Sequence, residues 1–254
     1  MLFIELTPLI FIICLFTLLL AGIVKGALGM GLPLFAVPIL VTVFDLPTAI
    51  ALMIVPILTS NLIQAWEGKN KQISISTFKR FFPLIITLIP FTIFTAQYIS
   101  KIDIKLGSLF MGLIVIIFSL SNLINNNIII KPKAEIIISP IIGIIAGILG
   151  GISSLIGPLI AMYLIALKLE KDFFVITIAI IFLSFSITLY STLAINGVMN
   201  FNNITGSLLA TIPVMFGVIL GNKLRGKINQ KKFKIILIIF LIIIGINLIR
   251  KGLS

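Results

Sequence analysis

The sequence is poor in the side chains that most often carry out chemistry. It contains no histidine and a single cysteine, Cys14, which lies inside an apolar run. Disulfide frameworks, Cys/His metal sites and histidine acid–base catalysis are therefore excluded, and Cys14 is interpreted as a small buried hydrophobic residue. No metal ion or cofactor is expected, and the chain has no phosphate-cradling glycine loop that would let it use ATP directly.

Acidic residues are also scarce, with seven against nineteen Lys and Arg. All seven fall at or beyond the ends of the apolar runs: Glu5, Asp45, Glu67, Asp103, Glu135, Glu170 and Asp172. Because no carboxylate is predicted mid-membrane, the sequence disfavours an intramembrane proton relay and a cation site made of carboxylates. An enzyme is not favoured either, since the interior offers no acid pair and no nucleophile beside an activating base.

Apolar side chains, by contrast, are abundant. Hydrophobic residues make up 60% of the chain and charged residues 10%, and the mean hydropathy is +1.31. A soluble domain could not cover so much apolar surface with so few polar groups, so the natural solvent is the lipid bilayer. The long apolar runs lack the alternation of an outer-membrane barrel and therefore predict helices. We expect a multi-pass protein of the bacterial cytoplasmic membrane with a retained first helix.

The apolar runs divide into ten spans of roughly membrane-crossing length. Five precede a polar connector at 125–135 and five follow it. The predicted spans are 8–24, 28–44, 48–66, 81–99, 106–124, 137–149, 154–167, 173–195, 206–220 and 233–249.

The two halves of the chain resemble each other in sequence. Residues 21–26 match 146–151, and Pro33 matches Pro158 at the same offset of 125 residues. After a small gap the next landmarks align in the same order, Gly68 with Gly197 and Pro83 with Pro213. Ordered Gly and Pro landmarks are harder to obtain by chance than apolar matches in so Ile-rich a chain. The sequence therefore predicts a first transmembrane repeat at 1–127 and a second at 128–254.

The basic residues predict the orientation of the two copies. The loop after the third span carries four of them, Lys69, Lys71, Lys79 and Arg80, whereas its counterpart at 196–205 carries none. With five spans per copy and the N-terminus outside, fifteen of the nineteen basic residues face the cytoplasm. The prediction is two inverted repeats of about five transmembrane helices each, as in many secondary transporters. The basic clusters are then cytoplasmic loops, and no nucleic-acid partner is expected.

Each copy carries a Gly-rich segment and a Pro between its first two spans, at 22–33 and at 143–158. Gly permits a bend and Pro suits a first helical turn, so each segment predicts a broken helix near the midplane. Free N–H groups at a helix start attract anions, and paired interruptions indicate a transporter's binding site. Tight packing by small residues is the alternative interpretation. The candidate substrate-binding residues here are Lys25, Gly26, Gly29, Gly31, Gly150, Gly151, Ser153 and Ser154.

Two polar side chains near these segments have open interpretations. Asn61 lies in the middle of an apolar span, where an amide is costly unless it has a partner, so it either bonds a neighbouring helix or contacts the substrate. Lys25 either snorkels at the cytoplasmic boundary or assists in anion binding. Both remain candidate substrate-binding residues, and we expect the two breaks to meet near the bilayer centre around one small anion.

The motifs resemble those of one known family. They are the Gly-rich stretch that leads to Pro33 and Pro38, its weaker repeat at 150–158, and the run 56–66 before a basic loop. Over nearly its whole length the chain resembles the sulfite exporter TauE/SafE family, also called TSUP. The resemblance implies transport of sulfite, sulfonates or related sulfur oxyanions. Departures from the family's glycine pattern, which put the substrate in question, are Ala27, Met30, Ser153 and Ser154.

These features favour a secondary transporter or facilitator that moves a small anion, by resemblance a sulfur oxyanion such as sulfite or an organosulfonate. An anion channel explains the breaks and the missing acids almost as well, but a carrier saturates and shows counterflow whereas a pore need not. A non-transport role in membrane assembly is compatible with the sequence, and so is a homo-oligomer.

The difference in basic residues between equivalent loops predicts the membrane topology. In a chain without the native Cys14, single cysteines placed at Asn70 and Asn202 should react with an impermeant thiol reagent from opposite sides of the membrane, because equivalent loops of inverted repeats face opposite sides. Labelling of both positions from the same side would contradict the inverted arrangement.

Overall fold

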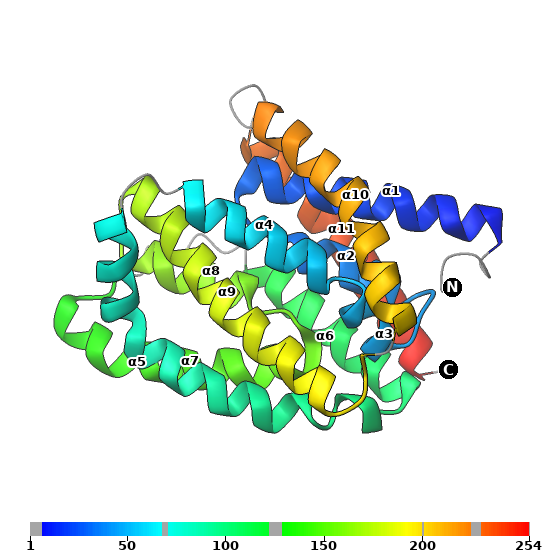
Figure 1. The fold of residues 1–254 in the computed structure, drawn as a ribbon, viewed down its shortest axis with the longest axis horizontal. Coiled ribbons are helices and arrows are strands. Elements are labelled where there is room, and N and C mark those ends of the chain that lie inside the picture. Colours follow the sequence, from blue (N-terminus) through cyan, green and yellow to red (C-terminus); the bar gives the residue numbers. More distant parts are fainter. Residues whose placement is uncertain (1–6, 68–70, 122–128, 200, 225–229, 254) are drawn as a thin grey trace. The chain divides into compact units, whose positions relative to one another are not determined.

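The computed structural model describes residues 7–67, 71–121, 129–199, 201–224 and 230–253. Over these residues the regular structure consists of eleven α-helices and one short 3₁₀-helix, with no β-strand (Figure 1). The prediction of an all-α protein is confirmed. The predicted boundary between the two repeats, at 127–128, and the labelling position Asn70 lie outside the described residues.

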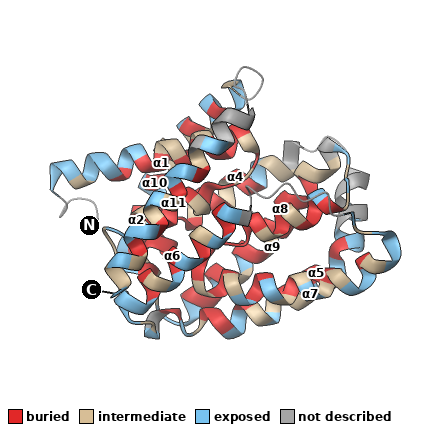
Figure 2. Cartoon of the chain, turned by 180° about the vertical axis from the view of Figure 1, so that it is seen from behind, coloured by how far each residue is buried: buried red, intermediate tan, exposed pale blue. Residues whose placement is uncertain are grey.

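Six segments are long and apolar enough to cross a membrane: Pro8–Leu28, Leu46–Ala65, Phe78–Ala96, Pro132–Ser153, Phe173–Ile195 and Phe201–Leu224. Large apolar side chains lie on the exposed sides of these helices, and Figure 2 shows how much of α1 (Pro8–Leu28) is exposed. Ile137 and Phe216, for example, are 67% and 66% exposed. Water would penalise so much exposed apolar surface, whereas lipid would not. The prediction of a polytopic membrane protein therefore agrees with the structure.

The first of two compact units comprises Met1–Pro56, Ser100–Asn125 and Gly197–Ser254. Its helices are α1 (Pro8–Leu28), α2 (Leu32–Leu40), α3 (Leu46–Ala51), α6 (Ile104–Ser121), α10 (Phe201–Leu224) and α11 (Gln230–Leu253). Within this unit α1 packs along α10, and α6 packs along α11. Cys14 is buried in α1, as predicted. At the far end of α11, the ammonium of Lys251 donates to the carbonyl of Val41, 2.9 Å away, at the end of α2.

The second unit comprises Ile57–Ile99 and Asn126–Asn196. It holds most of α4 (Ile54–Glu67), together with α5 (Lys71–Ala96), α7 (Pro132–Ser153), α8 (Gly157–Ala166) and α9 (Lys171–Ile195); the 3₁₀-helix η1 (Ile99–Lys101) begins at its last residue. Here α5 packs along both α7 and α9 (Figure 1). Each unit takes helices from both halves of the sequence, so the units cut across the two predicted repeats, which stay a prediction.

Nine of the ten predicted spans fall largely on one helix each, but α2 and α8 have only nine and ten residues, too few to cross a membrane, so ten crossings stay a prediction. The third predicted span, at 48–66, is two helices, α3 and α4. Pro56 explains the interruption at Leu52 and Met53, because its ring would collide with the carbonyl of Leu52 in a continuous helix and it has no N–H to donate. The new helix start leaves an N–H on Val55, which donates to the hydroxyl of Ser207 on α10, 2.9 Å away. The N–H group that the interruption frees therefore has a hydrogen-bond acceptor within the first unit.

Small residues bring the paired helices into close contact. Gly22 and Gly26 on α1 face Gly217 and Gly221 on α10, and a Cβ at any of the four would meet backbone atoms of the opposite helix. Such close packing by small residues at four-residue spacing is a common way for helices to associate in membranes. The α1–α10 pair therefore depends on these glycines for its separation.

The α5–α7 pair of the second unit is built in the same way, with hydrogen bonds added. The glycines at every fourth position of α7, Gly143, Gly147 and Gly151, face the backbone of α5. On α5, the hydroxyl of Thr87 donates to the carbonyl of Pro140 at 3.0 Å, and that of Thr95 to the carbonyl of Gly147 at 3.2 Å. Both contacts fix α7 in its position before the second break.

These glycine contacts predict a difference between two alanine variants of the first unit. Gly217→Ala should lower the stability of the purified protein by about 1–3 kcal/mol, because the new methyl group would overlap the α1 backbone. Gly107→Ala is the control, since its Cβ would only touch side chains of Leu46 and Ile102 at 3.4 and 3.5 Å. Thermal unfolding in detergent measures both. Equal midpoints for the two variants would show that α1 and α10 are not closely packed.

Candidate functional site

The first break, between α1 and α2, is imposed by two glycines. Gly29 ends α1 in the left-handed region with a φ of 79°, and its N–H donates to the carbonyl of Lys25, 2.8 Å away. Gly31 precedes α2 with a φ of 103°. Other residues adopt these conformations less readily, so the backbone favours glycine at both positions, most strongly at Gly31. Gly29 and Gly31 therefore lie where the sequence predicts the break.

The second break, between α7 and α8, repeats the end of the first. Ser154 ends α7 in the left-handed region with a φ of 64°, and its N–H donates to the carbonyl of Gly150, 2.6 Å away. Ser154 corresponds to Gly29 at the offset of 125 residues that also aligns Pro33 with Pro158. The two helix ends thus agree in geometry at the positions that the sequence alignment pairs.

The helices that follow the breaks share a proline and the lack of a cap, although the residue before each differs in φ, 103° at Gly31 and −99° at Ile156. Pro33 and Pro158 are the second residues of α2 and α8, and neither helix start has a side-chain cap. The hydrogen bonds that first return to the residue before each helix come from the N–H groups of Phe35 and Ile160. The earlier N–H groups of each first turn have no partner within their helix, and the helix dipole adds partial positive charge there. Such a helix start can bind an anion.

Three of the candidate glycines are in contact with other parts of the protein. A Cβ at Gly26 would lie 2.9 Å from the Cα of Gly221, and one at Gly151 would lie 2.9 Å from the carbonyl oxygen of Thr92. A Cβ at Gly150 would lie 2.6 Å from the ring of Phe185 on α9. Gly26 and Gly151 therefore pack helices together, and a role of these three glycines in substrate binding stays a prediction.

The two candidate serines differ in their hydrogen bonds. The hydroxyl of Ser153 donates to the carbonyl of Leu149 at 2.7 Å and accepts from the N–H of Leu155 at 3.1 Å, so the break itself satisfies it. The hydroxyl of Ser154 makes no hydrogen bond to any described residue, although Ser154 is only 1% exposed. A buried hydroxyl without a partner costs about 1–3 kcal/mol. Of the two, Ser154 is the one whose side chain has hydrogen-bonding capacity left for a ligand.

Lys25 and Asn61 are both buried, with exposures of 4% and 1%. Lys25 lies on α1 one turn before Gly29, and its side chain does not extend to the surface as a snorkelling lysine would. Asn61 lies inside α4. Burial is what a substrate site inside a membrane protein requires of a polar residue, and the roles of both residues stay predictions.

Aromatic side chains of α9 cover the second break. The sequence did not predict this contact. A Cβ at Gly157, the first residue of α8, would lie 3.5 Å from the ring of Phe182. Phe185 lies against Gly150, and the hydroxyl of Tyr190 lies close to that of Ser154. These three aromatic residues come from about two turns of one helix, so α9 closes the break within the second unit.

A signal for Tyr190 was present in the sequence. The offset of 129 residues that aligns Gly68 with Gly197 also pairs Asn61 with Tyr190. The two residues are both polar and both lie inside long helices. At the offset of 125 residues Asn61 would instead pair with Ser186, so this signal depends on where the small gap between the copies is placed. The Gly and Pro landmarks alone do not point to Tyr190, which is why the predicted site lacks it.

Comparison with known proteins bears directly on these motifs. A family model described as sulfite exporter TauE/SafE matches residues 14–248. The chain belongs to the sulfite exporter TauE/SafE family. The resemblance inferred from the Gly and Pro motifs is thereby confirmed, and both breaks lie within the matched region. No curated protein and no solved structure matches the chain. Membership of the TauE/SafE family makes this chain a member of a membrane transporter family.

An ion pair joins α5 to α7 in this TauE/SafE protein. Arg80 donates from Nε to Oε1 and from Nη2 to Oε2 of Glu135, at 2.8 Å in each case. Its guanidinium also lies over the rings of Phe81 and Phe173, 5.4 and 5.9 Å from their centroids. Two parallel charge-assisted hydrogen bonds are the strong form of a salt bridge, and Glu135 sits in the first turn of α7, where a carboxylate is favoured.

The other acids whose side chains the structure describes are exposed. They are Asp45, Asp103 and Glu170. Since Glu135 is paired with Arg80, none of these four carboxylates is an unpaired group in the interior. Within the described part of the chain, no cluster of His, Cys, Asp or Glu could hold a metal ion either. The buried polar groups near the breaks are therefore mainly donors rather than anionic acceptors.

The ion pair between Arg80 and Glu135 predicts that neutralising Glu135 lowers the stability of the protein. Glu135→Gln should lower stability by about 1–2 kcal/mol, because the guanidinium loses a charged acceptor; the 40% exposure of the Arg80 side chain keeps the loss below that of a fully buried pair. The exposed Glu170→Gln is the control. Both are compared by thermal unfolding in detergent. An unchanged midpoint for Glu135→Gln would mean that Arg80 contributes nothing through this pair.

Proposed function

We propose that the chain moves a small oxyanion across the bacterial cytoplasmic membrane as a secondary transporter or facilitator, and that the substrate is a sulfur oxyanion such as sulfite or an organosulfonate. Family membership supports transport and the sulfur chemistry. The observation that supports an anionic substrate is the pair of helix starts at Pro33 and Pro158, neither of which has a side-chain cap. Each offers N–H groups and a positive dipole end to a negative ligand.

The balance of donors and acceptors supports an anion over a cation. A helix start carries the equivalent of roughly half an elementary positive charge, and the low dielectric of a membrane interior enlarges its effect. Lys25 lies on α1 one turn before the first break and is buried. A cation would need carboxylates or several aligned carbonyls instead, and the described carboxylates are exposed or paired with Arg80.

The order and pairing of the helices support two inverted repeats. The series α1, α2, α3–α4, α5 and α6 is followed by α7, α8, α9, α10 and α11. In the first unit α1 packs on α10, and in the second α7 packs on α5, so in each case the first span of one half packs on the fourth span of the other. Such reciprocal pairing is expected of two copies related by a two-fold axis. With the opposite loop charges, it supports an axis in the membrane plane and alternating access.

Uptake into liposomes tests the proposal. Vesicles with the purified protein should take up labelled sulfite with saturable kinetics and counterflow, and unlabelled sulfonate or thiosulfate should compete. Gly31→Ala should lower the rate at least tenfold, because its φ of 103° and the Val24 side chain, 3.2 Å from the new Cβ, distort the start of α2. Gly107→Ala is the control that keeps the wild-type rate.

Three outcomes would contradict the proposal. The first is vesicles that take up none of the sulfur oxyanions above the rate of protein-free vesicles. The second is uptake that rises linearly with concentration and shows no counterflow, which would indicate a channel. The third is Gly31→Ala with the wild-type rate, which would place transport away from the first break.

A further inference from the structure

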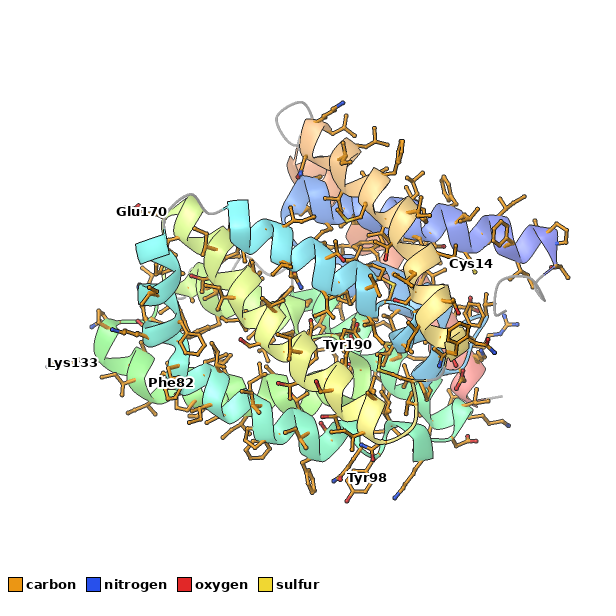
Figure 3. All side chains as sticks on the ribbon, viewed as in Figure 1. Cys14, Phe82, Tyr98, Lys133, Glu170 and Tyr190 are labelled. Carbon is orange, nitrogen blue, oxygen red and sulfur yellow. The ribbon has the colours of Figure 1, made fainter. Side chains whose placement is uncertain are left out.

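Two buried hydroxyls face each other at the second break. Ser154 is 1% exposed and Tyr190 is 4% exposed, and the two groups lie side by side. Among the described residues neither hydroxyl has a well-formed hydrogen bond, and a polar group close to each is the other hydroxyl. Figure 3 marks Tyr190 on α9, which is the helix that covers the break. Buried hydroxyls without well-formed hydrogen bonds are costly for folding, and where they also lie beside an uncapped helix start they point to a ligand.

The start of α8 adds further donors at the same place. Ser154 ends α7, and α8 begins three residues later at Gly157. Among the described residues, no hydrogen bond is found for the N–H groups of Ile156, Gly157 or Leu159. The N–H of Leu155 is taken by Ser153, and that of Ile160 bonds the carbonyl of Ile156. The hydroxyls and the helix start thus form one group of donors within the second unit.

We propose that Ser154 and Tyr190, together with the first turn of α8, form an oxyanion-binding site in which both hydroxyls donate to the oxygens of the ligand. This inference rests on the proposed transport function and adds Tyr190 to its site. A ligand with several oxygens on one centre can accept from two hydroxyls and a helix start at once, which a halide cannot do with the same geometry.

The chemistry of the site also explains how it differs from the first break. At the offset of 125 residues, Ser154 corresponds to Gly29 and Gly150 corresponds to Lys25. The first break therefore has a buried lysine and no hydroxyl at these positions, and the second has a hydroxyl and no lysine. A site of neutral donors holds an anion weakly enough to release it, as a transporter requires. The hydroxyls then confer selectivity for oxygen acceptors without adding charge.

A second pair of hydroxyls in the same unit provides an internal control. Tyr163 on α8 and Ser139 on α7 are buried and also lack hydrogen-bond partners among the described residues. Tyr163 lies with its ring edge-on to that of Phe81, 6.3 Å between centroids, close to the Arg80 and Glu135 pair. This pair is in the body of α8 rather than at its start, so the N–H groups of the helix start do not lie beside it.

The experiment compares sulfite binding and stability in three variants of the full chain, by calorimetric titration in detergent and by thermal unfolding without added anion. Tyr190→Phe and Ser154→Gly should each weaken sulfite binding on the order of tenfold, the usual effect of losing one hydrogen bond to a charged group. Without anion, both should unfold at or above the wild-type midpoint, because each loses a buried hydroxyl without a partner and glycine suits the φ of 64° at Ser154. Tyr163→Phe should keep the wild-type affinity.

The possible results separate this inference from the proposed function. Wild-type affinity in both Tyr190→Phe and Ser154→Gly, with lowered midpoints, would show that the hydroxyls are structural and would overturn the inference alone. An equal loss of affinity in Tyr163→Phe would also overturn it, because the effect would not be local to the break. If the wild-type protein neither binds nor transports sulfite, thiosulfate or a sulfonate, the proposed function itself fails.

Discussion

Backbone amides have no partners in hydrocarbon, so a helix that stops inside a membrane must satisfy its ends locally or present them to a ligand. At each break of this chain, the end of the preceding helix and the start of the following helix treat their free backbone groups differently. The ends of α1 and α7 are closed by Gly29 and Ser154, whose N–H groups return to carbonyls of the preceding turn. The starts of α2 and α8 have no cap, and their proline removes one N–H but leaves the others. The proposed affinity for anions rests on this asymmetry, together with the buried donors beside the second break.

The Gly-rich segments serve both packing and the breaks, and the residues divide by position on the helix. Gly22 and Gly26 lie four residues apart and face α10, whereas Gly29 and Gly31 lie at the end of the helix and adopt positive φ. On α7 the packing glycines continue to Gly151, next to the break itself. Packing and helix interruption are therefore adjacent, and the position of each break is fixed by a helix pair that cannot slide without backbone clashes.

Much of this could be predicted from the sequence, and the remainder has physical reasons. Apolar length and the Gly and Pro residues that interrupt it are local signals, and they predicted the helical class, the positions of most helices and both breaks. The interruption before Pro56 was equally local, but the apolar length of 48–66 favoured a continuous span there. Packing partners are not local: nothing in α1 indicates that it packs on α10, so the packing alternative for Gly26 had no partner helix. Tyr190 depends on the fold of α9 over the break, and only the pairing with Asn61 hinted at it.

The most direct test of the account is to locate a bound oxyanion. Selenite has the shape and charge of sulfite, and its selenium scatters anomalously, so crystals of the protein soaked in selenite would show its position. The account predicts a selenium peak at the start of α8, placed so that the selenite oxygens lie within hydrogen-bond distance of the hydroxyls of Ser154 and Tyr190. A peak found only at exposed lysine or arginine side chains, with none at either helix break, would contradict it.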